Sequence, residues 1–374
     1  MNIRSFVPRT GSTALVLLAS LVLATACNRD KKPQETPSAT ATAKAGAKIA
    51  LLLPESKAAR YESHDRPHFE RKVKALCPDC QVLYSNADQD AAKQQNQAEA
   101  ALTNGAKVLV LDPVDSASAA SIVQRAKQSK VPVISYDRLI LNADVDYHIA
   151  FEVEPIGKLQ AQTLLDKLKA DGKAGGTIVL IHGAATDHNS KLLKDGAYSV
   201  LKGSGLVVGA EYDTPDWSPD KAQQQMEQAL TALGKDKIAG VYAANDGTGG
   251  GAISALKAAG VSPLPPVTGQ DAELAAIQRI IAGEQYMTIY KALKQEAEVA
   301  AEFAVALARG ETPPMEKVTG KLQNGTKEVP AVLLAPVAVT KENVKSTVIA
   351  DGFWTVEQIC TGEYKAACVA AQFP

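Results

Sequence analysis

Short apolar runs alternate with longer polar, Ala- and Gln-rich stretches along the first half of the chain. Runs of this length are typical of buried strands, and the stretches between them are long enough for helices. The predicted strands cover residues 48–53, 81–84, 107–111 and 131–136. The predicted helices cover residues 67–76, 91–104 and 116–129. This alternation predicts a parallel sheet with helices on both faces.

The same alternation starts again after Pro155. Its predicted strands cover residues 177–181, 206–212, 238–243 and 266–268, and its predicted helices cover 155–170, 190–201, 219–233 and 249–259. A helix at 272–283, a strand at 285–290 and a long helix at 291–309 are expected to follow. Because one hydrophobic core seldom serves so many residues, the sequence predicts an α/β protein of two similar lobes.

The N-terminal 47 residues follow a different pattern. Arg4 and Arg9 precede an apolar stretch that ends at Cys27, which is the layout of a secretory signal and is shorter than a membrane span of roughly 20 residues. The residues after it contain almost no bulky apolar side chain and are expected to form a linker. We therefore expect a signal peptide at 1–26 and a lipid-modified Cys27 with a linker at 27–47. The protein would then be held at the outer face of the cell membrane or lie in the periplasm.

Cleavage without lipidation is the alternative, because Ala24 stands where such sites usually carry leucine. The 40 basic and 41 acidic side chains give a net charge of −1. No basic run follows the linker, so nucleic-acid binding is not indicated.

Four further cysteines, in a chain that is expected to leave the cytosol, predict disulfides. Of the three possible pairings, the shortest loops favour Cys77 with Cys80 and Cys360 with Cys368. A redox motif or half of a metal site is the alternative for the first pair. Both would need features that are missing around it, namely a helix that begins there or a second pair of ligands. We expect no metal.

Polar residues cluster where the predicted strands end. Ligands of open parallel sheets bind beyond the carboxyl ends of the strands. The residues in such places are Asp112, Asp137, Arg138, His182, Asp187, His188, Asn189, Asn245, Asp246, Gln270, Asp271 and Lys291. Carboxylates, amides and cations together can pair with several neutral hydroxyl groups, and Tyr61 and Trp217 are candidates for covering the C–H face of a sugar ring.

Each of these residues has an ordinary structural alternative, because Asp and Asn after strands also form turns and helix caps. Asp112 is interpreted as a turn residue, and Asp246 as a cap or a support of the hinge. Gly247, Gly249 and Ala252 have the spacing of a dinucleotide-binding motif. Asn245 and Asp246 would repel a pyrophosphate, so close helix packing is the preferred explanation. No common catalytic motif occurs, and we expect neither a cofactor nor an enzyme.

Several longer motifs resemble a known family. They are Ser-Tyr-Asp-Arg at 135–138, Leu-Asn-Ala-Asp-Val-Asp-Tyr at 141–147, Gly-Lys-Leu-Gln-Ala at 157–161, Asn-Asp-Gly-Thr-Gly-Gly-Gly-Ala-Ile at 245–253, Gly-Gln-Asp-Ala-Glu-Leu-Ala at 269–275, Met-Thr-Ile-Tyr-Lys at 287–291 and Ser-Thr-Val-Ile-Ala-Asp-Gly-Phe at 346–353. From residue 48 to about 353 the chain resembles the bacterial D-xylose-binding proteins of ABC importers, which are type I periplasmic binding proteins of the ribose- and galactose-binding kind.

The resemblance implies two Rossmann-like (flavodoxin-like), doubly wound lobes joined by a three-segment hinge. The crossovers would lie near Phe151, Tyr290 and Leu334. The N-terminal lobe would then comprise residues 48–151 plus 291–334, and the C-terminal lobe residues 152–290 plus 335–374.

The resemblance also implies a site and partners. Its ligand contacts map onto Arg60, Asp137, Arg138, Asp187, Asn189, Trp217, Asn245, Asp271 and Lys291. The resemblance implies that the protein is a monomer and binds a monosaccharide, with D-xylose as the preferred candidate. It would deliver this sugar to an ABC permease and its ATPase subunit. One alternative is a lipoprotein that presents the sugar to a receptor or sensor kinase. Another is an enzyme that uses paired carboxylates as acid and base.

The chain departs from the family at three places. Tyr61 stands where the family has tryptophan, so the stacking wall is expected to be smaller. Phe-Glu-Val-Glu-Pro at 151–155 replaces the usual Phe-Asp-Asn-Glu of the first crossover. Both cysteine pairs are additions. These departures leave the preferred sugar open.

Overall fold

The computed structural model describes residues 46–373. The predicted signal peptide, Cys27 and nearly all of the predicted linker lie outside the described residues. Among the helices that are described, none is both long enough and apolar enough to cross a membrane.

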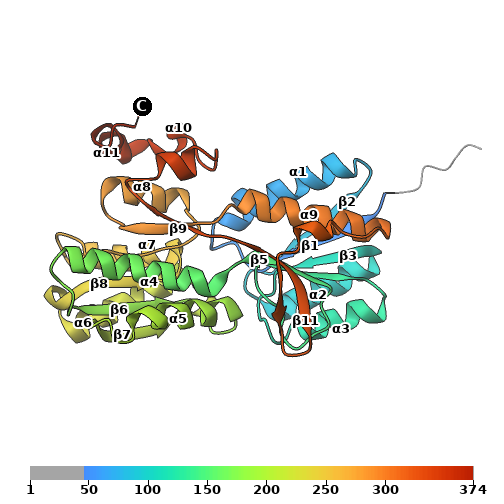
Figure 1. Ribbon diagram of the computed structural model, residues 1–374, viewed down its shortest axis with the longest axis horizontal. Coiled ribbons are helices and arrows are strands. Elements are labelled where there is room, and N and C mark those ends of the chain that lie inside the picture. The colour runs from blue at the N-terminus through green and yellow to red at the C-terminus, as the bar shows by residue number, and fades with distance from the viewer. Residues whose placement is uncertain (1–45, 374) are drawn as a thin grey trace, which may run out of the picture. The chain divides into compact units, whose positions relative to one another are not determined.

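A seven-stranded sheet forms the centre of what we call the first lobe (Figure 1). Its strand order is β10-β11-β5-β4-β3-β1-β2, and every pair is parallel except the antiparallel β10–β11 hairpin. The strands are β1 (Lys48–Leu53), β2 (Gln81–Asn86), β3 (Ala106–Leu111), β4 (Val133–Tyr136), β5 (Tyr147–Phe151), β10 (Gly320–Gln323) and β11 (Glu328–Leu334).

Helices cover both faces of this sheet, as the alternating pattern predicts. The helices are α1 (Arg66–Leu76), α2 (Ala91–Thr103), α3 (Ala120–Gln128) and α9 (Leu293–Arg309). Ile49, Leu51 and Leu53 pack with residues of α1 and α9, whereas Ala50 and Leu52 pack with residues of α2 and α3. Since side chains alternate along a strand, β1 is buried on both sides and is apolar from Ile49 to Leu53.

The second lobe contains a parallel three-stranded sheet, β7-β6-β8, and a two-stranded antiparallel sheet, β12-β9. Its strands are β6 (Thr177–His182), β7 (Val207–Asp213), β8 (Ile238–Ala243), β9 (Met287–Tyr290) and β12 (Val337–Thr340). Its longer helices are α4 (Val153–Ala170), α5 (His188–Leu201), α6 (Pro219–Leu233), α7 (Asp246–Ala258) and α8 (Leu274–Ala282).

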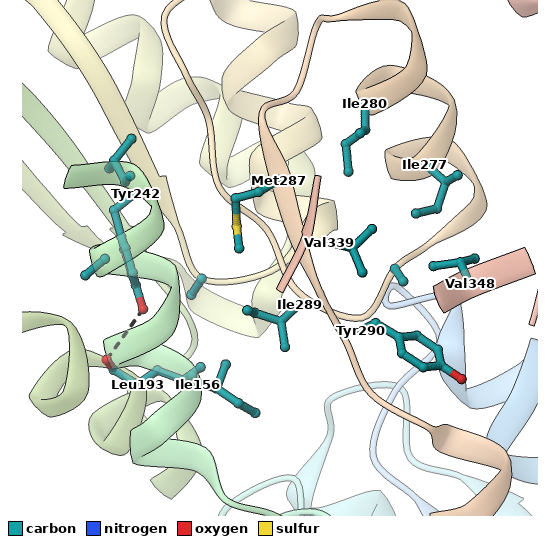
Figure 2. Packing of buried hydrophobic residues seen from close by; sticks show 14 of the residues in the cluster. Ile156, Leu193, Tyr242, Ile277, Ile280, Met287, Ile289, Tyr290, Val339 and Val348 are labelled. Carbon is teal, nitrogen blue, oxygen red and sulfur yellow. Dashed lines mark hydrogen bonds between the residues drawn. The ribbon is translucent and has the colours of Figure 1, made fainter. Parts of the chain in front are cut away.

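The largest described core cluster joins both of these sheets to α4, α5 and α8 (Figure 2). Met287 and Ile289 of β9 lie between Ile156 on one side and Val339 on the other. Tyr242 is fully buried and its hydroxyl donates to the carbonyl of Leu193 at 3.4 Å. The burial fixes α4, α5 and β9, which border the candidate site, relative to one another.

The chain passes between the lobes three times. It leaves β5 at Phe151 and enters α4 at Val153, leaves β9 at Tyr290 and enters α9 at Leu293, and leaves β11 at Leu334 and enters β12 at Val337. The residue at which each lobe begins and ends stays a prediction.

A C-terminal segment follows β12 and packs on α8. It contains η5 (Lys345–Ile349), α10 (Val356–Ile359), η6 (Gly362–Tyr364) and α11 (Lys365–Ala370). Disulfides join Cys77 to Cys80 and Cys360 to Cys368, which is the pairing that short loops favour. Cys77 follows the last residue of α1, so the first disulfide joins a helix end to the start of β2.

Some elements differ from the predicted ones. β5, β10, β11 and β12 were not predicted; β5, β10 and β12 have only four or five residues each, and β11 contains Pro330, which is unfavourable in a strand. The predicted strand at 266–268 is only a bridge between Val241 and Val267. The helix predicted from residue 249 begins at Asp246 instead, because Asn245 caps it.

Candidate binding site

The ten residues that the sequence predicts as ligand contacts all line one cavity, which receives side chains from both lobes. They are Arg60, Tyr61, Asp137, Arg138, Asp187, Asn189, Trp217, Asn245, Asp271 and Lys291. Their convergence is a property of the structure, and their contact with a ligand stays a prediction. The other strand-end residues named from the sequence are not part of this lining; they are Asp112, Asp246, His188 and His182, which is the last residue of β6.

Seven further residues complete the lining. They are Glu55, Ala58, Phe151, Val153, Ile156, Leu193 and Gln270. The strand-end argument named Gln270, and it could also have found Glu55, which follows β1. Phe151 and Val153 belong to the altered first crossover, which therefore forms part of the cavity wall.

Arg60 lies at the centre of a buried ion network in the first lobe. Its Nε and Nη2 donate to Asp65 at 2.8 and 2.7 Å, Nη2 also donates to Glu296 at 2.8 Å, and Nη1 donates to Asp137 at 2.5 Å. Burial alone would lower the pKa of Arg60, but these carboxylates outweigh it and raise that pKa well above its usual value. The guanidinium is therefore a fixed cation at the cavity wall.

Lys291 joins a carboxylate of each lobe. Its Nζ lies 3.3 Å from Oδ2 of Asp137 and 3.0 Å from Oδ1 of Asp271. Burial alone would raise the pKa of Asp137, but the charges of Arg60, Lys291 and Arg138 outweigh it and hold that pKa below its ordinary value. Asp137 is thus an ionised acceptor at neutral pH. The buried Oδ1 of Asp271 accepts no hydrogen bond within the described part of the chain.

Arg138 makes a second set of contacts across the lobes. Its Nε lies 3.0 Å from Oδ2 of Asp187, and its Nη2 donates to the hydroxyl of Tyr61 at 3.3 Å. Asp112 is fully buried, with Oδ1 3.6 Å from the same Nε. The interpretation of Asp112 as a turn residue leaves out this contact with Arg138. Burial raises the pKa of Asp112 well above its ordinary value, although the charge of Arg138 lowers it.

Asp187 and Asn189 begin α5 and face the first lobe. Asp187 caps the helix by accepting from the backbone of Asn189 at 2.8 Å, and it also accepts from Nε1 of Trp217 at 3.1 Å. The Nδ2 of Asn189 donates to Oδ1 of Asp137 at 3.2 Å. Both side chains are therefore held in place by hydrogen bonds to neighbouring residues, and both line the cavity.

Asn245 caps α7 in a way that leaves its amide donor toward the site. Its Oδ1 accepts from the backbone and the hydroxyl of Thr248 at 2.9 and 2.8 Å. No protein acceptor for its Nδ2 occurs among residues 46–373. Asp246 was expected to cap a helix or to support the hinge. In the structure its carboxylate holds Gln285 and Thr288 and the backbone amide of Glu273. It accepts from Gln285 and Thr288 at 2.8 Å each, and burial raises its pKa to about 7.

Three of the lining residues have a left-handed backbone, with φ of 50° at Asp137, 53° at Trp217 and 94° at Asp271. Such angles are uncommon for residues with a Cβ and often occur at ligand sites. Gly183 makes room for the indole of Trp217, because a Cβ on Gly183 would lie 2.1 Å from that ring. The sequence shows neither the strain nor this packing.

Gly251, beside the glycine motif, serves helix packing; the preference for packing over nucleotide binding at Gly247 and Gly249 stays a prediction. A Cβ on Gly251 would lie 2.2 Å from the carbonyl oxygen of Pro219, and one on Gly249 would lie 2.9 Å from that of Thr268. Helices α6 and α7 can therefore approach each other only if residue 251 has no side chain.

Known proteins share this architecture. Residues 49–312 match the model of the periplasmic binding protein domain. The D-xylose-binding periplasmic protein of Escherichia coli K12 is 40% identical over 311 residues, which cover 82% of this chain and 90% of that protein. The multiple sugar-binding periplasmic receptor ChvE of Rhizobium radiobacter is 35% identical over 328 residues, covering 83% and 92%.

A similar solved structure is an ABC transporter solute-binding protein of Clostridium phytofermentans with bound β-D-glucose. Its TM-score is 0.77 at 29% sequence identity, over 83% of this chain and 99% of that one.

Proposed function

We propose, on the premise that this chain belongs to the periplasmic binding protein family, that it binds one monosaccharide in the cavity between its lobes and delivers it to an ABC importer. D-xylose is the first candidate, because a relative named for D-xylose binding is 40% identical. The family consists of substrate-binding transport proteins, so no catalytic step is assigned to the site.

The observation that carries the proposal is the mixture of groups around the cavity. Carboxylates of Asp137 and Asp271 face the cations of Arg60 and Lys291, with the amide of Asn245 beside them. A sugar hydroxyl donates one hydrogen bond and accepts others, so a neutral polyol can satisfy both kinds of group. An anionic or a cationic ligand would meet like charges on part of the wall.

Lobe closure is the proposed mechanism of capture. A ligand favours the closed form only if it contacts both lobes, and the cavity offers Asp137 and Arg138 from one side with Asn245 and Asp271 from the other. A wrong epimer would leave buried polar groups unpaired, at about 1–3 kcal/mol for each group. Discrimination among sugars would follow from such mismatches.

Export, lipidation of Cys27 and a monomeric state complete the proposal. Mass spectrometry of the mature protein tests the anchor, since an unmodified Cys27 or a chain that starts elsewhere contradicts it. A second candidate function is presentation of the sugar to a receptor, which the 35% identity to a protein named a sugar-binding receptor favours. Pull-down with permease and with receptor domains separates the two functions.

Titration calorimetry of the purified protein with D-xylose, D-glucose, D-ribose and L-arabinose is the decisive experiment. We expect D-xylose to bind with a micromolar or lower Kd, which corresponds to a binding free energy of about −8 kcal/mol or a more negative value. Tighter binding of D-glucose would correct the sugar and keep the function. Absence of heat with every sugar, in a protein that circular dichroism shows to be folded, would refute the proposal.

A further inference from the structure

The loop that carries Asp271 needs support from outside. Asp271 and Ala272 are consecutive residues with positive φ, 94° and 49°. Neither is glycine, and side chains disfavour this backbone region. The conformation therefore persists only where surrounding contacts enforce it.

Backbone groups of the loop are held one after another. The amide of Asp271 donates to the carbonyl of Ile289 at 2.9 Å. The amide of Ala272 donates to the hydroxyl of Thr288 at 3.2 Å. The carbonyl of Ala272 accepts from Nε1 of Trp354 at 2.8 Å. Trp354 is the only one of these partners that lies outside β9.

Trp354 belongs to the C-terminal segment, which α8 holds in place. The Nε2 of Gln278 in α8 donates to the carbonyl of Ile359 at 3.0 Å, and the disulfide between Cys360 and Cys368 closes the segment beyond it. Ile359 is fully buried in the largest core cluster. Trp354 is thus attached to a braced element and not to a free tail.

The residue before it reaches the other lobe. Phe353 stacks on His64 with ring centroids 3.9 Å apart and planes inclined by 5°, and Trp354 meets the same imidazole edge-on at 4.7 Å. His64 precedes Asp65, the partner of Arg60. Burial lowers the pKa of His64 to about 4, so the stack contains a neutral ring at neutral pH.

We propose that Trp354 is a positioning residue of the sugar site. It holds the strained loop so that the carboxylate of Asp271 faces the cavity, and Phe353 links that loop to the segment that carries Arg60. The inference rests on the proposed function, since it concerns how the site holds its sugar. It also assigns a role to the C-terminal segment that is separate from stability.

The test uses the full mature protein and D-xylose, with D-glucose as the second probe. Trp354→Phe keeps most of the packing and removes the hydrogen bond to Ala272. One hydrogen bond corresponds to a loss of about fivefold to tenfold in affinity for whichever sugar the unaltered protein binds. The matched control is Lys345→Ala, which removes a hydrogen bond of the same C-terminal segment, from Nζ of Lys345 to the carbonyl of Gln372 at 2.6 Å, without touching Trp354 or Gln278, and should leave affinity within about twofold.

A pair of variants at Thr288 separates positioning from general destabilisation. Thr288→Val removes the hydroxyl that holds the amide of Ala272, and we expect weakened binding. Thr288→Ser keeps the hydroxyl and should restore affinity, even if its thermal midpoint falls as far as that of the valine variant. Unchanged affinity in Trp354→Phe, or equal losses in Trp354→Phe and Lys345→Ala, overturns the inference and leaves the proposed function standing. Failure of the unaltered protein to bind any sugar overturns both.

Discussion

The two halves of the candidate site are built by different forces. In the first lobe, Arg60 is held by three carboxylates, all within 2.8 Å of its nitrogens. In the second lobe, Asn245 and Asp271 are held through a helix cap and backbone hydrogen bonds. Charge pairs couple binding to folding, because a buried ion that loses its partner destabilises the whole lobe. The carboxylate of Asp271 also pairs with Lys291 at 3.0 Å, but backbone contacts hold this residue independently of that pair, so binding and stability should separate there.

Removal of Arg60 should give the largest effect. Arg60→Ala leaves Asp65, Asp137 and Glu296 buried with Lys291 as the nearest cation. Breaking such a buried network costs about 3–5 kcal/mol, so we expect the free energy of unfolding in urea to fall by that amount and sugar binding to be lost. Arg66→Ala is the control, because Arg66 pairs with Glu62 and Glu70 at an exposed site. It should cost less than about 1 kcal/mol. Equal effects of both variants would contradict the comparison.

Asp271→Asn should show the opposite balance. The substitution keeps the shape of the side chain and removes one negative charge. The buried network contains more carboxylates than cations, so it can lose this charge. We expect affinity for the sugar to fall about a hundredfold, equivalent to 2–3 kcal/mol, while the free energy of unfolding changes by less than about 1 kcal/mol. Calorimetry and urea unfolding on the same sample measure both. Unchanged affinity would remove Asp271 from the site.

Gly251→Ala should lower the stability of the protein and leave its sugar affinity unchanged. The added methyl group would lie 2.2 Å from the carbonyl oxygen of Pro219, so α6 and α7 must move apart. Overpacking of this kind costs about 1–3 kcal/mol, and we expect the sugar affinity to stay within about twofold because neither Gly251 nor Pro219 belongs to the cavity lining. Ser254→Ala on the exposed side of the same helix is the control. A stability equal to that of the unaltered protein would show that the helices have room.

The same contrast explains what the sequence could predict. The strand and helix alternation was recognisable because β1, β3 and β8 are buried, continuous apolar runs. Once the strand ends were recognised, the polar residues that follow them could be named, which is how Asp137, Arg138 and Asp271 were predicted. Arg60 came only from the family resemblance, since it follows β1 at a distance and caps a short irregular helix, η1 (Tyr61–Asp65). Tyr61, the first residue of η1, was already a candidate as an aromatic cover of a sugar ring.

Supporting residues escaped prediction because their partners are remote in the sequence. Glu296 is 236 positions from Arg60, and Trp354 is 82 positions from Ala272. No local pattern connects such pairs. The positive φ of Asp271 could not be predicted either. No turn motif in the sequence requires it, and contacts with other segments hold this backbone angle in place.

The smallest predicted effect concerns pH and Glu273, whose side chain accepts from the backbone of Ala59 in the first lobe at 3.2 Å. Burial, together with the charges of Asp246 and Asp271, raises the pKa of Glu273 to about 8 from an ordinary 4.5. The folded state therefore favours the protonated acid. The stability that Glu273 contributes is fully present below about pH 4.5 and is lost as the pH rises toward 8.

Glu273→Gln keeps the acceptor and removes the titration. Because Glu273 is partly exposed, solvent reduces the effect, and we expect the variant to gain about 1 kcal/mol over the unaltered protein between pH 5 and pH 8. Asp137 has the opposite sign, since its lowered pKa gives stability that is present at neutral pH and lost in acid. Urea unfolding at pH 5, 6, 7 and 8 measures the difference. Parallel curves for the two proteins would mean that Glu273 is ionised without cost, and that the second lobe holds its carboxylates by charge as the first lobe does.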